Sequence, residues 1–225
     1  MKRKIITTAD GSKTIHIEEW NEQYHSKHGA IQEANHVYLK HGLLYFISEM
    51  GNKGSHPISL LEIGFGTGLN ALLTLQAADS FKQHIDYVGV EAYPVNSEEL
   101  ELLDYPKALS IEPTTFHALH RTPWETMSQL SEYFKLIKQQ KYFSEIKDEN
   151  AFDVIYFDAF GARVQPELWT AEVFQRMYRA LKPNGVLTTY AAIGEVRRTL
   201  SALGFEVERL KGPPGKRHMI RAIKR

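Results

Sequence analysis

The sequence LLEIGFGTGLN at residues 60–70 constrains the fold more than any other stretch of the chain. An apolar run over residues 58–63 predicts a buried strand, three alternate glycines follow it, and an apolar-rich segment over residues 69–81 predicts a helix. The start of such a helix presents backbone N–H groups and a positive dipole end to a ligand. Glycines admit a positive φ and let a ligand approach the backbone closely. We therefore expect a ligand with a nucleoside-like body over residues 64–68.

Strand and helix patterns alternate along the rest of the chain. Further strands are predicted over residues 85–90, 134–140, 152–158, 186–191, 205–210 and 218–223, and helices over 97–103, 170–181 and 194–203. Such alternation is typical of a mostly parallel sheet with helices on both faces. We predict a Rossmann-like α/β fold with a mostly parallel seven-stranded sheet, whose last two strands form an antiparallel hairpin at one edge.

The first 55 residues are predicted to form a small extension. Strands over residues 4–8 and 13–19 flank Ala9-Asp10-Gly11-Ser12, and Asp-Gly between strands indicates a hairpin. A loop over residues 20–29 is followed by two helices, 30–38 and 43–50, with Gly42 between them, and by a loop over 51–55. We therefore divide the chain into an N-terminal extension, residues 1–55, and a main domain, residues 56–225.

Composition excludes several classes of protein. The 225 residues carry a formal net charge of zero and include no cysteine, which excludes disulfides, iron–sulfur clusters and thiolate zinc sites. The histidine pairs His25/His28 and His117/His120 lie in no convincing cluster, so no metal site is expected. The sequence has no run of membrane-spanning length and no signal peptide, so we expect a cytoplasmic protein that is not attached to a membrane.

The glycine spacing distinguishes between cofactors. The turn reads G-x-G-x-G rather than the dinucleotide pattern G-x-G-x-x-G, and it lacks the Gly-Lys-Ser/Thr of a P-loop. With Glu62 two residues before the first glycine, it resembles motif I of the class I S-adenosylmethionine-dependent methyltransferases. This cofactor carries an ammonium and a sulfonium and no phosphate, so a carboxylate beside the glycines is electrostatically reasonable. The predicted cofactor-binding residues are Glu62, Gly64, Phe65, Gly66, Thr67, Gly68, Asn70 and Glu91.

Two carboxylates at other strand ends have expected roles. Glu91 ends the next strand and is predicted to accept hydrogen bonds from the ribose hydroxyls; the alternative is a solvated strand end. Many methyltransferases have an acidic residue after the third strand that faces adenine. No acidic residue directly follows residues 134–140 here, so Lys141, Tyr142 or a backbone group is expected to replace it. Asp158 ends an apolar strand and is the predicted catalytic residue, because a carboxylate there stabilises an attacking amine and accepts its proton. Its alternative role is a helix cap or a structural acceptor.

Several longer motifs carry a family resemblance. Residues 152–160, 165–170, 194–198 and 212–217, and the early run that includes Tyr24-His25-Ser26 and His36-Val37-Tyr38-Leu39, are similar to the tRNA 5-methylaminomethyl-2-thiouridine methyltransferases, the methyltransferase half of bifunctional MnmC enzymes. The resemblance implies methylation of the exocyclic amine of 5-aminomethyl-2-thiouridine at the tRNA wobble position, with Asp158 beside that amine. It also implies S-adenosyl-L-methionine as cofactor and no FAD, because the chain ends before an oxidoreductase domain. A separate enzyme is then expected to supply the aminomethyl group.

A second set of residues is expected to contact the substrate. Lys216, Arg217 and Arg197 are predicted to bind tRNA phosphate, with a solvated turn or an ion pair as the alternative. Phe160 is predicted to stack on the flipped uridine, and Tyr24 and His25 to form a lid, unless they only pack the loop. Trp169 is expected to pack in the core or under a lid. We expect a monomer.

Two other functions remain open at this point. One is a small-molecule amine N-methyltransferase on the same fold, and the other is an RNA-binding module that holds the cofactor without catalysis. Activity on free amines without tRNA would favour the small-molecule methyltransferase. Failure to methylate undermodified tRNA would favour the RNA-binding module.

Overall fold

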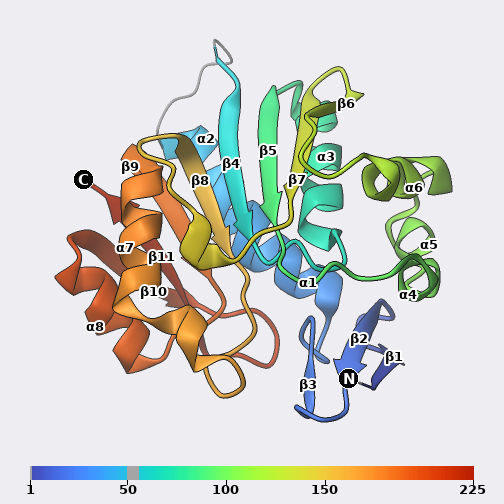
Figure 1. The fold of residues 1–225 in the computed structure, drawn as a ribbon, viewed down its shortest axis with the longest axis horizontal. Coiled ribbons are helices and arrows are strands. Elements are labelled where there is room, and N and C mark those ends of the chain that lie inside the picture. The colour runs from blue at the N-terminus through green and yellow to red at the C-terminus, as the bar shows by residue number, and fades with distance from the viewer. Residues whose placement is uncertain (1, 50–55) are drawn as a thin grey trace.

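An eight-stranded mixed sheet forms the centre of the computed structural model, which describes residues 2–49 and 56–225 (Figure 1). The expected loop at residues 51–55 and the expected domain boundary after residue 55 therefore lie outside the described residues. The strands follow in the spatial order β10 (Phe205–Lys211), β11 (His218–Lys224), β9 (Leu181–Thr189), β8 (Phe152–Phe157), β4 (Ile58–Ile63), β5 (Ile85–Val90), β7 (Phe134–Gln139) and β6 (Ser128–Ser131).

The prediction of seven strands was wrong. The additional strand, β6, pairs antiparallel with β7 at the edge of the sheet, and its register shifts between Gln129 and Ser131. This strand is four residues long and mostly polar, so it lacks the apolar alternation by which a strand is recognised in sequence. The expected antiparallel hairpin at the other edge is confirmed by the pairing of β10 with β11.

The five central strands, from β9 to β7, are parallel, and their carboxyl ends lie along one edge of the sheet. In the pairing of β4 with its neighbours, Glu62 lies opposite Gly89 of β5 and Tyr156 of β8. Glu91 and Asp158 each follow the last residue of a neighbouring strand. The parallel register therefore brings all three carboxylates to the same edge.

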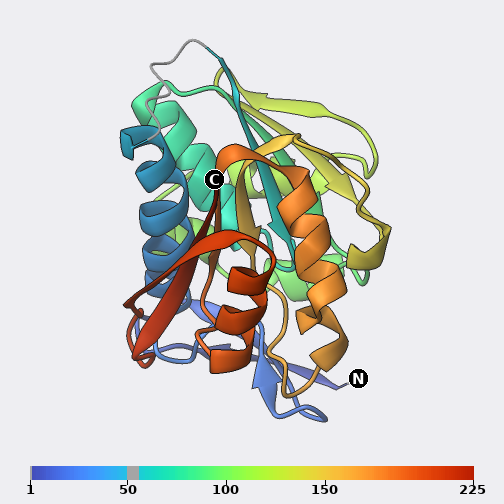
Figure 2. The ribbon, with the colours of Figure 1, turned by 90° about the vertical axis from the view of Figure 1, so that its left-hand side faces the viewer.

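Helices cover both faces of the sheet, as Figure 2 shows from the side. One face carries α3 (Leu69–Phe81) and a long helix made of α1 (Ala30–Ala34), the π-helical segment η1 (Asn35–Leu44) and α2 (Tyr45–Glu49). The other face carries α7 (Ala171–Ala180) and α8 (Gly194–Ala202). Because side chains alternate along β8, Tyr156 enters the hydrophobic core under α3 and the long helix, and Phe157 enters the hydrophobic core under α7 and α8.

The long helix corrects an expectation. Residues 30–49 form one continuous helix, without the break expected at Gly42. A Cβ atom at Gly42 would lie 3.0 Å from the ring of Tyr156 and 3.1 Å from Oγ1 of Thr188. Glycine is therefore present to let the helix approach the sheet, and not to end it. The central turns adopt the wider π-helical form, which is rare and is often found at functional sites.

The N-terminal residues form a three-stranded antiparallel sheet of β1 (Arg3–Thr7), β2 (Lys13–Ile17) and β3 (Glu22–Gln23). The β1–β2 hairpin is confirmed, and β3 lies in the segment expected to be a loop. Figure 1 shows this sheet next to the carboxyl ends of the central strands. Oδ2 of Asp10 accepts the backbone N–H of Gln32, and the guanidinium of Arg163 donates to the carbonyl oxygen of Trp20. These bonds hold the small sheet over the rim of the main one.

Shorter elements fill the connections. The region around residues 105–127 contains two helices that were not predicted, α5 (Tyr105–Leu109) and α6 (Pro113–Arg121), and α6 buries Phe116 and Leu119 on one side. The remaining helices are α4 (Ser97–Glu101), η2 (Phe143–Glu145) and η3 (Pro166–Trp169). In the part of the chain that the structure describes, no helix combines the length and the apolar character that crossing a membrane requires.

Candidate active site

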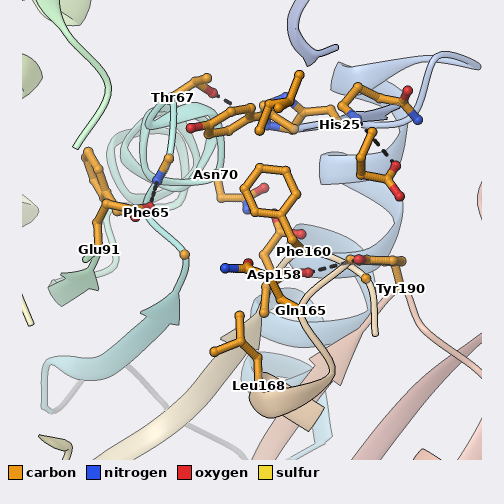
Figure 3. Close-up of a pocket in the computed structure, with 18 of the residues that line it drawn as sticks. His25, Phe65, Thr67, Asn70, Glu91, Asp158, Phe160, Gln165, Leu168 and Tyr190 are labelled. Carbon is orange, nitrogen blue, oxygen red and sulfur yellow. Dashed lines mark hydrogen bonds between the residues drawn. The ribbon is translucent and has the colours of Figure 1, made fainter. Parts of the chain in front are cut away.

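A cavity of about 790 Å³ lies at the carboxyl ends of the central strands, between them and the N-terminal sheet. Figure 3 shows Asp158 and Phe160 between Glu91 on one side and Tyr190 on the other. The size is within the range of small-molecule sites. The cavity brings together most of the residues predicted from sequence, namely Tyr24, His25, Glu62, Gly64, Phe65, Gly66, Thr67, Asn70, Glu91, Asp158, Phe160 and Lys216.

The glycine turn forms a cradle at one end of this cavity. Gly64 and Gly66 have φ of 90° and 49°, which disfavours any other residue. A Cβ atom at Gly64 would lie 2.7 Å from the carbonyl oxygen of Asp158, so the turn and the end of β8 are in direct contact. The backbone N–H of Gly66 donates to Oε2 of Glu91 at 3.0 Å. The Glu91 carboxylate is therefore held against the turn, where it can also accept hydrogen bonds from a ligand.

Gly68 has a different role from the other two glycines. It begins α3 with φ of 73° but does not line the cavity. A Cβ atom there would lie 2.9 Å from Cδ2 of Leu119 and 3.1 Å from the ring of His120, both on α6. The third glycine therefore allows the helix α6 to pack against the turn.

Glu62 is buried at the end of β4 and is bonded to the protein through both oxygens. Oε1 accepts from Nδ2 of Asn70 at 2.9 Å, and Oε2 accepts from the hydroxyl of Tyr87 at 2.7 Å. Burial raises the pKa of Glu62 well above its ordinary value, against these two hydrogen bonds, and the charge of Asp158 raises it further. A cation placed next to Glu62 would favour its ionised form.

Asp158 lies half-buried after β8 and receives a hydrogen bond on each oxygen. The hydroxyl of Tyr38 donates to Oδ1 at 2.6 Å, and Nδ2 of Asn70 donates to Oδ2 at 2.8 Å. Burial raises the pKa of this carboxyl to about 7, assisted by the charge of Glu33, while the two hydrogen bonds and Lys216 lower it. Asp158 therefore titrates near neutral pH, which suits a group that takes up and releases a proton.

A second group of side chains borders the cavity near Glu91. Ala92, Tyr93, Tyr142, Phe143 and Ser144 line it, and the hydroxyls of Tyr93 and Tyr142 lie 3.4 Å apart. Of the residues considered for adenine, Tyr142 is at the cavity and Lys141 is not. Phe143 and Ser144 belong to the short helix η2, which carries no motif by which sequence reasoning identifies a binding site.

Lys216 reaches into the cavity from the loop between β10 and β11. Its ammonium forms an ion pair with the buried carboxylate of Glu33 and lies 3.8 Å from the centre of the Tyr190 ring. The other oxygen of Glu33 accepts the backbone N–H of Ser26 at 3.0 Å. The charge of Lys216 is thus directed inward, and the nearest exposed cation of this loop is Arg217.

Aromatic side chains form the wall next to Asp158. The ring of Phe160 packs edge-on against Tyr24 at 4.8 Å and Trp20 at 5.5 Å between ring centres. Trp169 packs in the core against Phe157, as expected, and its indole N–H donates to the carbonyl oxygen of Phe160. The Phe160 backbone is therefore fixed, while its ring faces the cavity.

His25 is buried and hydrogen-bonded on the side of the cavity. Nδ1 lies 3.0 Å from Oγ1 of Thr14, and Nε2 lies 3.5 Å from Oγ1 of Thr67. Burial lowers the pKa of His25 to about 4, so the ring is neutral at pH 7. The residue links the N-terminal sheet to the glycine turn.

Arg197 and Arg217 are exposed and do not line the cavity. Neither side chain has an ion-pair partner among residues 2–49 and 56–225. Within the same part of the chain, no group of three or more His, Asp or Glu side chains is placed to hold a metal ion.

Besides the residues near Glu91, the residues of the site that sequence reasoning missed include Trp20, Glu33, Tyr38 and Tyr190. Glu33 and Tyr38 come from the long helix that packs across the sheet, and Tyr190 follows β9. The run that includes Glu33 and Tyr38 carries part of the family resemblance, which is the available sequence signal for these two residues. Nothing in the local sequence indicates that Trp20 or Tyr190 lines the cavity.

The residues present fit S-adenosyl-L-methionine. The positive-φ glycines leave room for a ligand against the backbone, and Glu91 offers carboxylate oxygens at the turn. Glu62 supplies a carboxylate for a ligand that carries an ammonium and a sulfonium. Residues 126–225 match the model of a family described as S-adenosyl-L-methionine-dependent methyltransferase.

Two solved structures are similar in fold. MnmC2 from Aquifex aeolicus superposes with a TM-score of 0.76 at 24% identity, over 98% of this chain and 70% of that one. A spermidine synthase in complex with the transition-state analogue AdoDATO has a TM-score of 0.62 at 18% identity, over 99% and 70%. The chain therefore shares its fold with these two proteins, and its residues 126–225 are similar to the S-adenosyl-L-methionine-dependent methyltransferases.

The chain is also similar to the MnmC proteins. It is 29% identical over 222 residues to the tRNA 5-methylaminomethyl-2-thiouridine biosynthesis bifunctional protein MnmC of Marinomonas sp. (strain MWYL1), covering 91% of this chain and 31% of the relative. The MnmC of Leptospira interrogans is also 29% identical, over 90% and 32%. The chain thus spans about a third of the length of these relatives.

Proposed function

We propose that this protein transfers a methyl group from S-adenosyl-L-methionine to the exocyclic amine of 5-aminomethyl-2-thiouridine at the tRNA wobble position, giving 5-methylaminomethyl-2-thiouridine. The observation that carries the proposal is Asp158, a carboxyl with a pKa of about 7 that touches the glycine cradle and faces the aromatic wall of the same cavity. The similarity to MnmC proteins, whose name states this modification, supports tRNA as the substrate.

The geometry assigns a role to each group. When bound, S-adenosyl-L-methionine supplies an electrophilic methyl group on a positively charged sulfur. Residues Glu62, Gly64, Phe65, Gly66, Thr67, Asn70 and Glu91 would hold it, with Gly68 supporting the turn from behind. An aminomethyl group is protonated at neutral pH, so its nitrogen has no lone pair to donate. Asp158 accepts that proton and so frees the lone pair, which forms the bond to the methyl carbon while the sulfur keeps the electron pair of its bond to that carbon and leaves as a neutral thioether. Once the proton has passed to solvent, the Asp158 carboxylate stabilises the positive charge that the nitrogen has regained.

The acceptor base would lie against the aromatic wall. Phe160 presents its ring to the cavity beside Asp158, and a flipped uridine stacked there would place its 5-substituent near the carboxylate. Tyr24 packs on Phe160 and His25 on the turn, so both belong to the cover that the N-terminal sheet forms over the cavity. Lys216 supports this wall through Tyr190 and Glu33.

Phosphate contacts are proposed for the exposed cations outside the cavity. Arg217 follows Lys216 in the β10–β11 loop, which borders the cavity, and Arg197 lies near the start of α8. Both are free of ion pairs within the described residues, so they can neutralise phosphates without first losing a partner. We also propose that the protein acts as a monomer in the cytoplasm, on an aminomethyl intermediate made by a separate enzyme.

Nucleoside analysis of tRNA tests this function. We expect a strain that lacks the protein to accumulate 5-aminomethyl-2-thiouridine, and the purified protein to convert that tRNA to the methylaminomethyl form with S-adenosyl-L-methionine. Unchanged nucleosides in the strain, together with activity on free amines that does not respond to tRNA, would instead indicate a small-molecule amine methyltransferase. Cofactor binding without any methyl transfer to the undermodified tRNA would refute the proposed catalysis.

A further inference from the structure

Tyr38 makes the shortest hydrogen bond to the candidate catalytic carboxylate. Its hydroxyl donates to Oδ1 of Asp158 at 2.6 Å, and only 2% of the residue is exposed. The same hydroxyl lies 3.4 Å from the carbonyl oxygen of Phe157, which is a much weaker contact. A buried tyrosine hydroxyl whose one proton is directed to a reacting carboxylate has a chemical consequence beyond packing.

The fold places this hydroxyl through an unusual helix segment. Tyr38 lies in the π-helical segment η1, which crosses the sheet next to β8 and β9. Gly42, one turn later, allows the close approach because any Cβ there would press on Tyr156. The ring of Tyr38 packs on that of Tyr156 at 5.3 Å between centres. The position of the hydroxyl is thus determined by rigid elements on which both rings are fixed.

The hydrogen bonds of Asp158 define its state. Tyr38 and Asn70 are both donors, and each occupies one lone pair of one oxygen, which leaves a lone pair on each oxygen for a substrate amine. Donors of this kind favour the ionised carboxylate over the neutral acid. Asn70 shares its amide with Glu62, so Tyr38 is the donor that serves Asp158 without also bonding a second carboxylate.

Other titratable groups surround the carboxylate and must be considered with it. Glu33 of α1 raises the pKa of Asp158, and Lys216 of the β10–β11 loop lowers it. Glu62 of β4 is linked to Asp158 through Asn70. Burial and the charge of Asp158 both raise the pKa of Tyr190, which follows β9 and donates its hydroxyl to the carbonyl oxygen of Ala159. Burial and Glu33 thus act against ionisation, and Tyr38 opposes them at the shortest distance.

We propose that Tyr38 is a positioning residue that holds Asp158 as an oriented, ionised acceptor for the substrate amine. The proposal rests on the proposed function for the identity of the amine. The effect of Tyr38 on the Asp158 carboxyl group is independent of the substrate, because their hydrogen bond is present in the protein alone. A residue with a purely structural role would alter stability and cofactor affinity but would leave the ionisation of Asp158 unchanged.

The test is the variant Tyr38→Phe, with Tyr156→Phe as the matched control. Tyr156 is also buried, and its ring packs on the ring of Tyr38. Its hydroxyl, however, lies 3.5 Å from Oγ1 of Thr74 and not next to Asp158. The pKa of Asp158 is measured by ¹³C NMR of labelled aspartate, assigned with Asp158→Asn. We expect Tyr38→Phe to raise this pKa by about one to two units, the size of one hydrogen bond to a charged group. The control should shift it by less than about 0.3 units.

Activity provides the second readout. In Tyr38→Phe, methyl transfer at pH 7 should fall about tenfold and recover by pH 9, where the carboxyl is again ionised. Asp158→Asn should not recover at any pH. A tRNA assay in which the wild type itself is inactive would count against the proposed function, while the NMR comparison would still decide the role of Tyr38.

A second variant covers the case in which Tyr38→Phe is unfolded. Incorporation of 3-fluorotyrosine at position 38 keeps the ring and the hydroxyl and makes the hydroxyl a stronger donor, so the pKa of Asp158 should fall. An Asp158 pKa that stays within about 0.3 units of the wild-type value in the folded variants would overturn the proposal.

Discussion

Gly64 and Asp158 face each other so closely that a Cβ atom at position 64 would lie 2.7 Å from the carbonyl oxygen of Asp158. The backbone N–H of Asp158 also donates to the carbonyl oxygen of Ile63 at 2.9 Å. The glycine turn and the candidate catalytic residue Asp158 are therefore parts of one rigid junction between β4 and β8. This contact brings the two halves of the proposed reaction into a single site.

Gly64→Ala should separate this junction. Its φ of 90° and the clash with a backbone atom both oppose a side chain, and we expect a loss of about 2–4 kcal/mol of stability together with loss of measurable cofactor binding. Gly11→Ala is the matched control, because Gly11 has a similar φ of 83° but nothing within 4 Å of its Cβ position. Thermal unfolding and calorimetric binding of S-adenosylhomocysteine measure both effects. Equal losses in the two variants would show that strain alone, and not the contact with Asp158, is responsible.

Asp158→Asn should stop catalysis and spare the cofactor. The amide keeps the shape of the carboxylate but accepts no proton, so methyl transfer to undermodified tRNA should fall by about 10²–10⁴-fold. The affinity for S-adenosyl-L-methionine should change by less than about threefold, since the cradle and Glu91 are intact. Single-turnover assays with labelled methyl groups, run alongside binding measurements, separate the two. Normal turnover would show that Asp158 is not the acceptor.

The rate should depend on pH through Asp158. Its pKa is raised to about 7, so the carboxyl is largely protonated at pH 6 and largely ionised at pH 8. Because only the ionised form accepts a proton, kcat/KM should rise about tenfold per unit below pH 7 and level off above it. Steady-state assays from pH 5.5 to 9, with S-adenosyl-L-methionine saturating, test this. A profile that is flat between pH 6 and 8 contradicts the assignment.

Glu91→Gln should weaken the cofactor specifically. The carboxylate accepts N–H groups of Gly66 and Tyr93 and has further lone pairs for the ribose, and an amide offers only one oxygen. We expect the Kd for S-adenosyl-L-methionine to rise about 10–100-fold. Glu98→Gln, on an exposed part of α4, is the control and should leave the Kd unchanged. Equal affinities for the wild type and both variants would mean that the Glu91 carboxylate makes no hydrogen bond to the cofactor.

Arg217→Gln should weaken tRNA binding without affecting the cofactor. If Arg217 contacts one phosphate, the slope of log K against log salt for tRNA should decrease by about one unit. Arg179→Gln is the control, because Arg179 is an exposed cation on α7 that does not line the cavity. Filter binding between 50 and 200 mM salt, roughly the range over which such contacts are resolved, provides the measurement. Identical slopes for the two variants would place the phosphates elsewhere.

Local patterns were sufficient for much of the site. The apolar run before Gly64 and the spacing of the glycines predict the strand, the turn and the helix, because their periodicity and φ requirements are properties of neighbouring residues. Parallel pairing then brings Glu62, Glu91 and Asp158 to one edge, as alternating strands and helices indicate. The glycine turn and the position of Asp158 at the end of β8 follow from these patterns alone.

Contacts between distant residues required the tertiary structure. Gly42 has the sequence character of a helix break, but its lack of a side chain serves the packing of the helix on Tyr156. The sequence predicts that Lys216 binds phosphate, but its ammonium forms an ion pair inside the protein with Glu33, which is 183 positions away in the chain. Burial and such pairings depend on the whole fold, which no local pattern records.

The sequence by itself therefore determined the strand, the glycine turn and the position of Asp158 at the end of a neighbouring strand. Only the tertiary structure decided how that carboxylate is held, because the hydroxyl of Tyr38 is 120 positions away in the chain and 2.6 Å away in space. Local sequence specifies backbone conformation through sterics and periodicity. The ionisation of a buried carboxyl is decided by every dipole and charge that the fold packs around it.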